Sequence, residues 1–297
     1  MSAPLVFDRP LLRARRARAA ALGPATFLID RVADDLVERL SAVLRRFELA
    51  VDLGTPTDAI ARALAASNAV GCIVRADALG PSGHPGLSVV ADEEALPFRD
   101  ASLDLVVSGL ALQFINDLPG TLAQVRRALK PDGLFIAALA GGDTLTELRQ
   151  SFATAEAEIQ GGMSPRVAPF ADLRDIGALL QRAGFALPVT DVERITVRYG
   201  SAFELMYDLR RMGAANALIE RRRLPLLRAT LLRMADAYAA RFADADGRIR
   251  ATFEIVWLSG WAPHESQQKP LAPGSAKHRL ADALGVTEIP AGDKAEP

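Results

Sequence analysis

The sequence between Phe47 and Leu139 contains five short apolar runs, separated by turns and by segments with helical spacing. The runs span Phe47–Leu53, Val70–Val74, Leu87–Val90, Leu103–Val107 and Leu134–Leu139. Because successive residues of each run are apolar, a strand formed by the run would be covered on both faces. The pattern is typical of a parallel, doubly wound α/β sheet, in which ligands bind beyond the carboxyl ends of the strands, where the strand order reverses.

Helices are predicted before, between and after these strands. Arg9–Arg46 has the spacing of two helices, interrupted at Gly23-Pro24. Thr57–Ala66 and Pro119–Leu129 are expected to be helical, and Lys130–Gly133 after the second is expected to form a turn.

The sequence becomes mainly helical after Gly141, with four helices expected between short strands. The helices are predicted at Asp143–Ile159 (with Asp143 as N-cap), Leu173–Ala183, Ala202–Met212 and Leu224–Phe242, and strands at Val192–Val197 and Ala251–Gly260. We therefore divide the chain into an N-terminal helical segment (1–46), an α/β core (47–140), a helical cap with the last strands of the same domain (141–262) and a disordered tail (263–297).

The composition is that of a globular protein in a reducing compartment. Half of the 297 residues are hydrophobic, and 35 Lys and Arg residues balance 36 Asp and Glu residues. The net charge of −1 argues against nucleic acid as the main partner. The single cysteine, Cys72, excludes an internal disulfide, and no apolar run is long enough to span a membrane. We expect a cytoplasmic protein, or a mitochondrial matrix protein if the source is eukaryotic.

Acidic residues follow the first three predicted strands. Asp52 ends the first strand, Asp77 follows the second, and Asp92 and Glu93 follow the third. Asp77 stands close to the ~20-residue offset at which an acid binds ribose hydroxyls in doubly wound folds. Singly, each acid is equally well explained as a solvated loop residue or a helix cap. Their occurrence at successive strand ends favours a nucleotide-like ligand.

Several motifs in the chain resemble those of a known family. ALPFRDASLDLVVSGLALQFINDLPGTLAQVRRALKPDGLFIAAL resembles the central segment of class I S-adenosylmethionine (SAM) methyltransferases. AGGDTLTELRQSF, FELMYDLRRMGAANAL and GWAPHESQQKPLAPGSA resemble one branch of that superfamily. That branch is the family of the mitochondrial respiratory complex I assembly factor, described as a methyltransferase and as a protein arginine hydroxylase. The resemblance extends from about Phe7 to Ala276 and implies a Rossmann-like, mostly parallel, seven-stranded sheet.

The resemblance implies a SAM site at the strand ends. It assigns Asp52 and Gly54 to the first SAM motif, Asp77 to the ribose, Asp92 and Glu93 to the adenine, and Ser108 to the methionine part. The usual first motif runs Asp-Leu-Gly-x-Gly-x-Gly, whereas this chain has Pro56 and Asp58 at the second and third glycine positions. Proline lacks a backbone donor, and a side chain at position 58 crowds a cofactor.

The sequence identifies no catalytic residue and no metal ligands. Methyl transfer requires mainly alignment of the nucleophile with the sulfonium methyl group. Arginine hydroxylation needs oxygen activation, and His84, His264 and His278 do not have the spacing of a non-haem iron site. If the substrate is an arginine, Asp143 and Glu147 are the candidate acids that receive it, although a helix cap and a surface acid explain them as well.

Three functions remain open from the sequence. The first is a SAM-dependent enzyme that modifies a protein, such as an arginine of a complex I subunit, by methylation or by hydroxylation. The second is a non-catalytic assembly factor with a degenerate SAM site, and the third is a small-molecule or acyl-carrier methyltransferase. The arginines at positions 13, 15, 16 and 18 are interpreted as a solvated helix face or as a docking site for an acidic partner.

Overall fold

The computed structural model describes residues 5–80, 86–170, 173–268, 275, 281–282 and 285–286. The chain divides into two units, Met1–Pro263 and His264–Pro297. In the second unit, the Gln267 N–H donates to the His264 carbonyl oxygen and closes a turn. Most of the tail predicted at 263–297 lies outside the described residues, as do His84 and His278.

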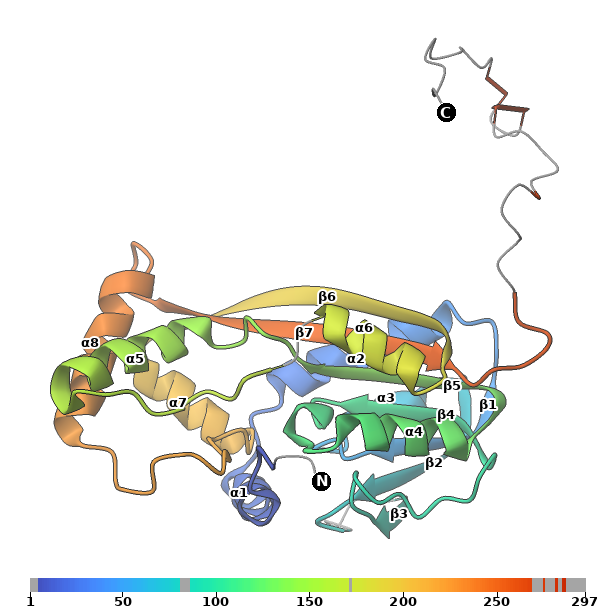
Figure 1. The fold of residues 1–297 in the computed structure, drawn as a ribbon, viewed down its shortest axis with the longest axis horizontal. Coiled ribbons are helices and arrows are strands. Elements are labelled where there is room, and N and C mark those ends of the chain that lie inside the picture. The colour runs from blue at the N-terminus through green and yellow to red at the C-terminus, as the bar shows by residue number, and fades with distance from the viewer. Residues whose placement is uncertain are drawn as a thin grey trace, which may run out of the picture. The chain divides into compact units, whose positions relative to one another are not determined.

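The first unit is built on a seven-stranded sheet, confirming the expected class I methyltransferase-like fold (Figure 1). Its strands are β1 (Phe47–Leu53), β2 (Val70–Asp77), β3 (Leu87–Val90), β4 (Leu103–Gly109), β5 (Leu129–Ala140), β6 (Ala186–Tyr199) and β7 (Ile249–Trp261). Their order is β3-β2-β1-β4-β5-β7-β6. The first five strands are mutually parallel, and β7 runs antiparallel to both of its neighbours.

The strand order reverses between β1 and β4. From β1 the chain first adds strands on one side, to β3, and then returns to add β4 and β5 on the other. A crevice forms at such a switch point because the connections leave the two central strands in opposite directions. In this chain the crevice lies where β1 ends at Leu53 and β4 ends at Gly109.

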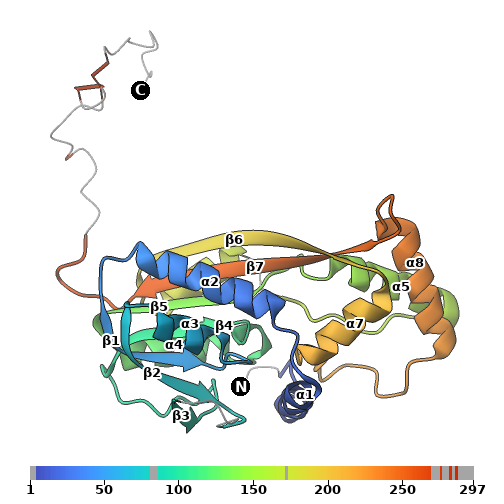
Figure 2. The ribbon, with the colours of Figure 1, turned by 180° about the vertical axis from the view of Figure 1, so that it is seen from behind.

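Helices cover both faces of the sheet. They are α1 (Arg9–Leu22), α2 (Phe27–Ser41), α3 (Ala59–Ala66), α4 (Leu118–Ala128), α5 (Thr146–Gln160), α6 (Leu173–Arg182), α7 (Ala202–Arg211) and α8 (Arg228–Phe242). Figures 1 and 2 show α2 and α3 on one face and α4 and α6 on the other. Each face has its own apolar core, one around Leu36 and Leu105 and one around Phe135 and Leu122.

The helical cap lies beyond the parallel strands. Both views show α5, α7 and α8 gathered at one end of the long β6–β7 pair (Figures 1 and 2). Tyr238 of α8 is buried and donates its hydroxyl to the Arg250 carbonyl oxygen of β7, at 2.9 Å. The N-terminal helix α1 packs against α7 and lies near the carboxyl ends of the central strands.

Two local predictions were wrong. Lys130–Gly133 is not a turn before β5 but an irregular part of that strand, since Leu103 pairs with Leu129 and Leu105 pairs with Leu134. Asp143 is not the N-cap of α5, which begins at Thr146 after Leu145 in a left-handed conformation (φ 55°). The Leu145 N–H donates to Thr252 of β7, so pairing with the sheet delays the start of the helix.

Candidate functional site

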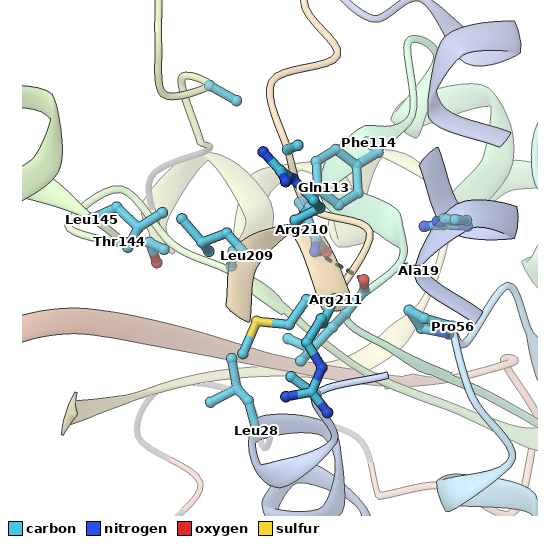
Figure 3. Close-up of a pocket in the computed structure, with 18 of the residues that line it drawn as sticks. Ala19, Leu28, Pro56, Gln113, Phe114, Thr144, Leu145, Leu209, Arg210 and Arg211 are labelled. Carbon is cyan, nitrogen blue, oxygen red and sulfur yellow. Dashed lines mark hydrogen bonds between the residues drawn. The ribbon is translucent and has the colours of Figure 1, made fainter. Parts of the chain in front are cut away.

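A cavity of about 640 Å³ lies at the carboxyl edge of the sheet, between the α/β core and the helical cap (Figure 3). The loop after β1 contributes Pro56, Thr57 and Asp58 to its wall. Segments after β4 and β5, the first turn of α2, and helices α1, α5 and α7 supply other parts of the lining. This volume lies in the range of small-molecule sites, and the place is the one at which doubly wound sheets bind ligands.

The loop that follows β1 is held by hydrogen bonds within the chain. Asp52 is buried, and its carboxylate accepts a bond from the Thr55 hydroxyl. The same hydroxyl oxygen accepts from the Gly109 N–H of β4 at 3.0 Å. Burial raises the pKa of Asp52 to about 7, although Thr55 and Arg75 oppose the rise. Asp52 therefore fixes the loop between the two central strands.

Asp77 at the end of β2 is also engaged by its own neighbours. Its Oδ1 accepts from the N–H groups of Leu79 and Gly80, at 2.8 and 3.0 Å. Its Oδ2 lies 3.4 Å from Nη2 of Arg75. These contacts use both oxygens of the acid that the family resemblance assigns to the ribose.

Three arginines of α1 bind the acids that follow β3, and we call this group the arginine clamp: Arg9, Arg13 and Arg16 with Asp92 and Glu93. Arg9 Nη2 lies 2.5 Å from oxygens of both acids. Arg13 pairs with Asp92, and Arg16 Nη1 lies 3.3 Å from Glu93 Oε1. The clamp joins the N-terminal helix to the sheet at the position assigned to the adenine.

The side chain of Glu93 lies directly against Gly54. A Cβ added to Gly54 would stand 2.6 Å from Glu93 Oε1, and the residue has a φ of 70°. Glycine therefore permits both the backbone conformation and the close approach of Glu93. In this chain the space beside the first motif is taken by a side chain of the protein itself.

The structure places the six predicted cofactor residues together at the strand ends but outside the lining of the cavity. Asp52, Gly54, Asp77, Asp92, Glu93 and Ser108 are all absent from that lining, in the described part of the chain. Ser108 is buried and donates its hydroxyl to the Leu53 carbonyl oxygen, at 2.7 Å. Pro56 and Asp58, which replace motif glycines, line the cavity instead. The assignment of the six residues at the strand ends to a cofactor stays a prediction.

This arrangement does not fit SAM. The acids that would bind the adenosine are bonded to Arg9, Arg16 and the backbone after Asp77. Glu93 fills the approach to Gly54, and Pro56 offers no N–H to a ligand. A bound adenosine would have to displace Arg9 or Arg16 from Asp92 and Glu93.

The two predicted substrate acids do not lie at the cavity. Glu147 is buried against β7, where it accepts from the Thr252 N–H at 3.1 Å and from the Thr252 hydroxyl at 2.5 Å. Asp143 is exposed and pairs with Arg194 of β6. Thr144 and Leu145, which lie between them in sequence, do line the cavity. A role of these acids toward substrate stays a prediction.

The role of the basic N-terminal helix is not apparent from the sequence. Arg16 was interpreted as part of a solvated or docking face, but its side chain is only 11% exposed. Burial is the largest influence on Arg16 and lowers its pKa, with Glu93 opposing that effect. No local pattern could reveal the pair, since 77 positions separate its members.

Comparison with known proteins identifies the family. The model of a methyltransferase domain matches residues 39–137. The chain is 41% identical to the human arginine-hydroxylase NDUFAF5, mitochondrial, over 302 residues that cover 98% of this chain and 87% of the human protein.

The chain belongs to the NDUFAF5 family. The zebrafish NDUFAF5 (Danio rerio) is 39% identical, with 96% of this chain and 91% of that protein covered. A malonyl-[acyl-carrier protein] O-methyltransferase of Halorhodospira halophila is 35% identical, with 88% and 90% covered. NDUFAF5 relatives thus share the superfamily with an enzyme whose name states a methyl transfer.

Solved structures show the same fold. The YcgJ protein of Bacillus subtilis aligns with a TM-score of 0.51 and 16% identity, covering 77% of this chain and 98% of that chain. The [4+2]-cyclase SpnF aligns with a TM-score of 0.50 and 16% identity, covering 88% and 98%. At this identity the likeness concerns the fold alone.

The described residues hold neither a membrane-spanning helix nor a cluster of metal ligands. None of their helices is both long enough and apolar enough to cross a membrane. They hold no group of three or more His, Cys, Asp or Glu side chains suited to a metal ion.

Proposed function

We propose that this member of the NDUFAF5 family serves in the assembly of respiratory complex I by binding a protein subunit, without methyl transfer. The family membership supports the assembly role, which the sequence motifs already implied. The observation that argues against methyl transfer is the arginine clamp. Its arginines are bonded to Asp92 and Glu93, the acids that a bound cofactor would need for itself. We expect the protein to act in the compartment where complex I subunits are assembled, the cytoplasm or the mitochondrial matrix.

The clamp opposes SAM for an energetic reason. Glu93 is almost fully buried, and its charge is balanced by Arg9 and Arg16. Moving Arg16 away would leave Glu93 paired with Arg9 alone, and losing a buried hydrogen bond to a charged group costs about 1.5–3 kcal/mol. SAM binding would have to supply this free energy before any net affinity appeared.

Calorimetric titration of the purified protein with SAM tests the proposal. We expect no heat of binding at millimolar SAM, for the wild type and for Asp77→Ala alike. Micromolar binding by the wild type that disappears in Asp77→Ala would overturn the proposal. A strain that lacks the gene should lose assembled NADH dehydrogenase. Expression of the wild type or of Asp77→Ala should restore the assembled enzyme.

A second candidate is an enzyme in which α1 swings away to admit the cofactor. The retained Asp52-Leu53-Gly54 motif and the acids at positions 77, 92 and 93 favour it. Mass spectrometry of NADH dehydrogenase subunits from the deletion strain separates the candidates. Loss of a methyl group from one side chain would support methyl transfer, and loss of a hydroxyl group from an arginine would support the activity named in the relatives. Our proposal expects unchanged subunit masses.

A further inference from the structure

The charges around the cavity are unequal in sign. Among the described residues, its charged lining consists of five arginines and one aspartate: Arg16, Arg62, Arg166, Arg210, Arg211 and Asp58. A cavity with this lining attracts an anion more readily than a cation, and a guanidinium group can hold a carboxylate through two parallel hydrogen bonds. The positive charge of the lining therefore favours an anionic ligand, such as a carboxylate.

Four of the five arginines already have partners within the chain. Arg16 pairs with Glu93, Arg62 with Asp58, Arg166 with Glu156 and Arg211 with Asp208. Asp58, the partner of Arg62, is the one acid among the described lining residues. These ion pairs offset part of the positive charge of the four arginines.

Arg210 of α7 differs from these four. It lines the cavity and is exposed, and its side chain has no ion pair or hydrogen bond to any of the described residues. Its neighbour Arg211 takes the nearby acid, Asp208. Arg210 is thus available to a ligand without the loss of an internal bond.

The remainder of the cavity is mainly apolar. Its walls include Leu28 from α2, Phe114 after β4, Leu145 just before α5, Leu148 in α5 and Leu209 from α7. Figure 3 shows several of them around the same space. No lysine, histidine or glutamate appears among the described lining residues. Apolar walls with a few placed polar groups are typical of small-molecule sites.

We propose that this cavity binds an organic acid with an extended apolar body, its carboxylate held by Arg210. The hydrocarbon part lies against the leucine and phenylalanine walls, where its burial supplies most of the affinity. Asp58 is the one acid among the described lining residues and is paired with Arg62, so the charge of the described lining favours an anionic ligand over a cationic one. This inference goes beyond the proposed function and does not depend on the absence of SAM.

Titration of the full-length protein with dodecanoate, below its critical micelle concentration, tests the inference. We expect saturable binding that weakens through decanoate to octanoate, as each shorter chain buries less apolar surface. Arg210→Gln should weaken dodecanoate binding about tenfold or more, and Arg210→Lys should retain most of it. Arg222→Gln, which removes an exposed arginine outside the cavity, is the matched control and should bind as the wild type does.

Dodecylamine provides the opposite charge on the same apolar body and should bind more weakly than dodecanoate. The inference is overturned if dodecylamine binds as tightly as dodecanoate, if dodecanoate does not bind, or if Arg222→Gln has the same effect as Arg210→Gln. The SAM titration reports separately on the proposed function. A protein that binds both SAM and dodecanoate would contradict that function and leave the present inference standing.

Discussion

Arg16 and Glu93 form a buried ion pair beside Gly54, with 3.3 Å between Nη1 and Oε1. The same Nη1 lies 3.5 Å from the Gly54 carbonyl oxygen. The pair connects the N-terminal helix to the first SAM-like motif. Breaking it should therefore change both the stability of the fold and the geometry around Gly54.

Removing Arg16 should destabilise the fold more than removing Arg13, the more exposed arginine of the clamp. Arg16→Ala leaves Glu93 with Arg9 alone, and we expect the free energy of unfolding to fall by about 2 kcal/mol, the cost of a buried hydrogen bond to a charged group. Arg13→Ala removes a side chain that is 42% exposed and should cost less than about 1 kcal/mol. Urea unfolding of both variants measures the difference. Equal losses would show that the Arg16–Glu93 pair contributes no more to the free energy of unfolding than the exposed Arg13–Asp92 pair.

Gly54 should tolerate no side chain. In Gly54→Ala the new Cβ meets Glu93 Oε1, and the φ of 70° is unfavourable for alanine. We expect a loss of about 2 kcal/mol or more in the free energy of unfolding. Gly142→Ala is the control, because a Cβ there meets no atom within 4 Å. Thermal unfolding compares the two variants, and a wild-type midpoint in Gly54→Ala would contradict the described packing.

Glu147 should contribute mainly to stability. Glu147→Ala leaves the Thr252 N–H and hydroxyl without their acceptor, and we expect the free energy of unfolding to drop by about 2 kcal/mol. Asp143→Ala breaks an exposed pair with Arg194 and should cost less than about 1 kcal/mol. Denaturant unfolding measures both. If Glu147→Ala is as stable as the wild type yet fails to support complex I assembly, the predicted substrate role gains support instead.

The titration of Asp52 should make the fold less stable as pH rises. Burial raises the pKa of Asp52 to about 7 in the folded protein, against about 3.9 in an unfolded chain. Between these values the folded state binds more protons than the unfolded state, so this group's contribution to stability falls as pH rises from about 4 to about 7. Thermal unfolding midpoints between pH 5.5 and pH 8 should therefore decline more steeply in the wild type than in Asp52→Asn. Parallel curves would refute this assignment.

Local sequence patterns predicted much of the fold. The run Phe47–Leu53 became β1 with the same bounds, and the Gly23-Pro24 break separates α1 from α2. These elements are readable because burial on both faces and helical periodicity leave their mark on adjacent residues. Lys130–Gly133 shows the limit of this reasoning, since its proline and glycine indicate a turn while pairing around it continues β5.

The candidate site was predicted less completely. The sequence by itself determined that Asp52, Asp77, Asp92 and Glu93 lie at the ends of neighbouring strands, because parallel strands direct their carboxyl ends to one edge. Only the tertiary structure decided what those acids bind. The packing of α1 brings Arg9 and Arg16 to Asp92 and Glu93 across more than 75 positions, and ion pairs between distant segments leave no periodic trace in a sequence.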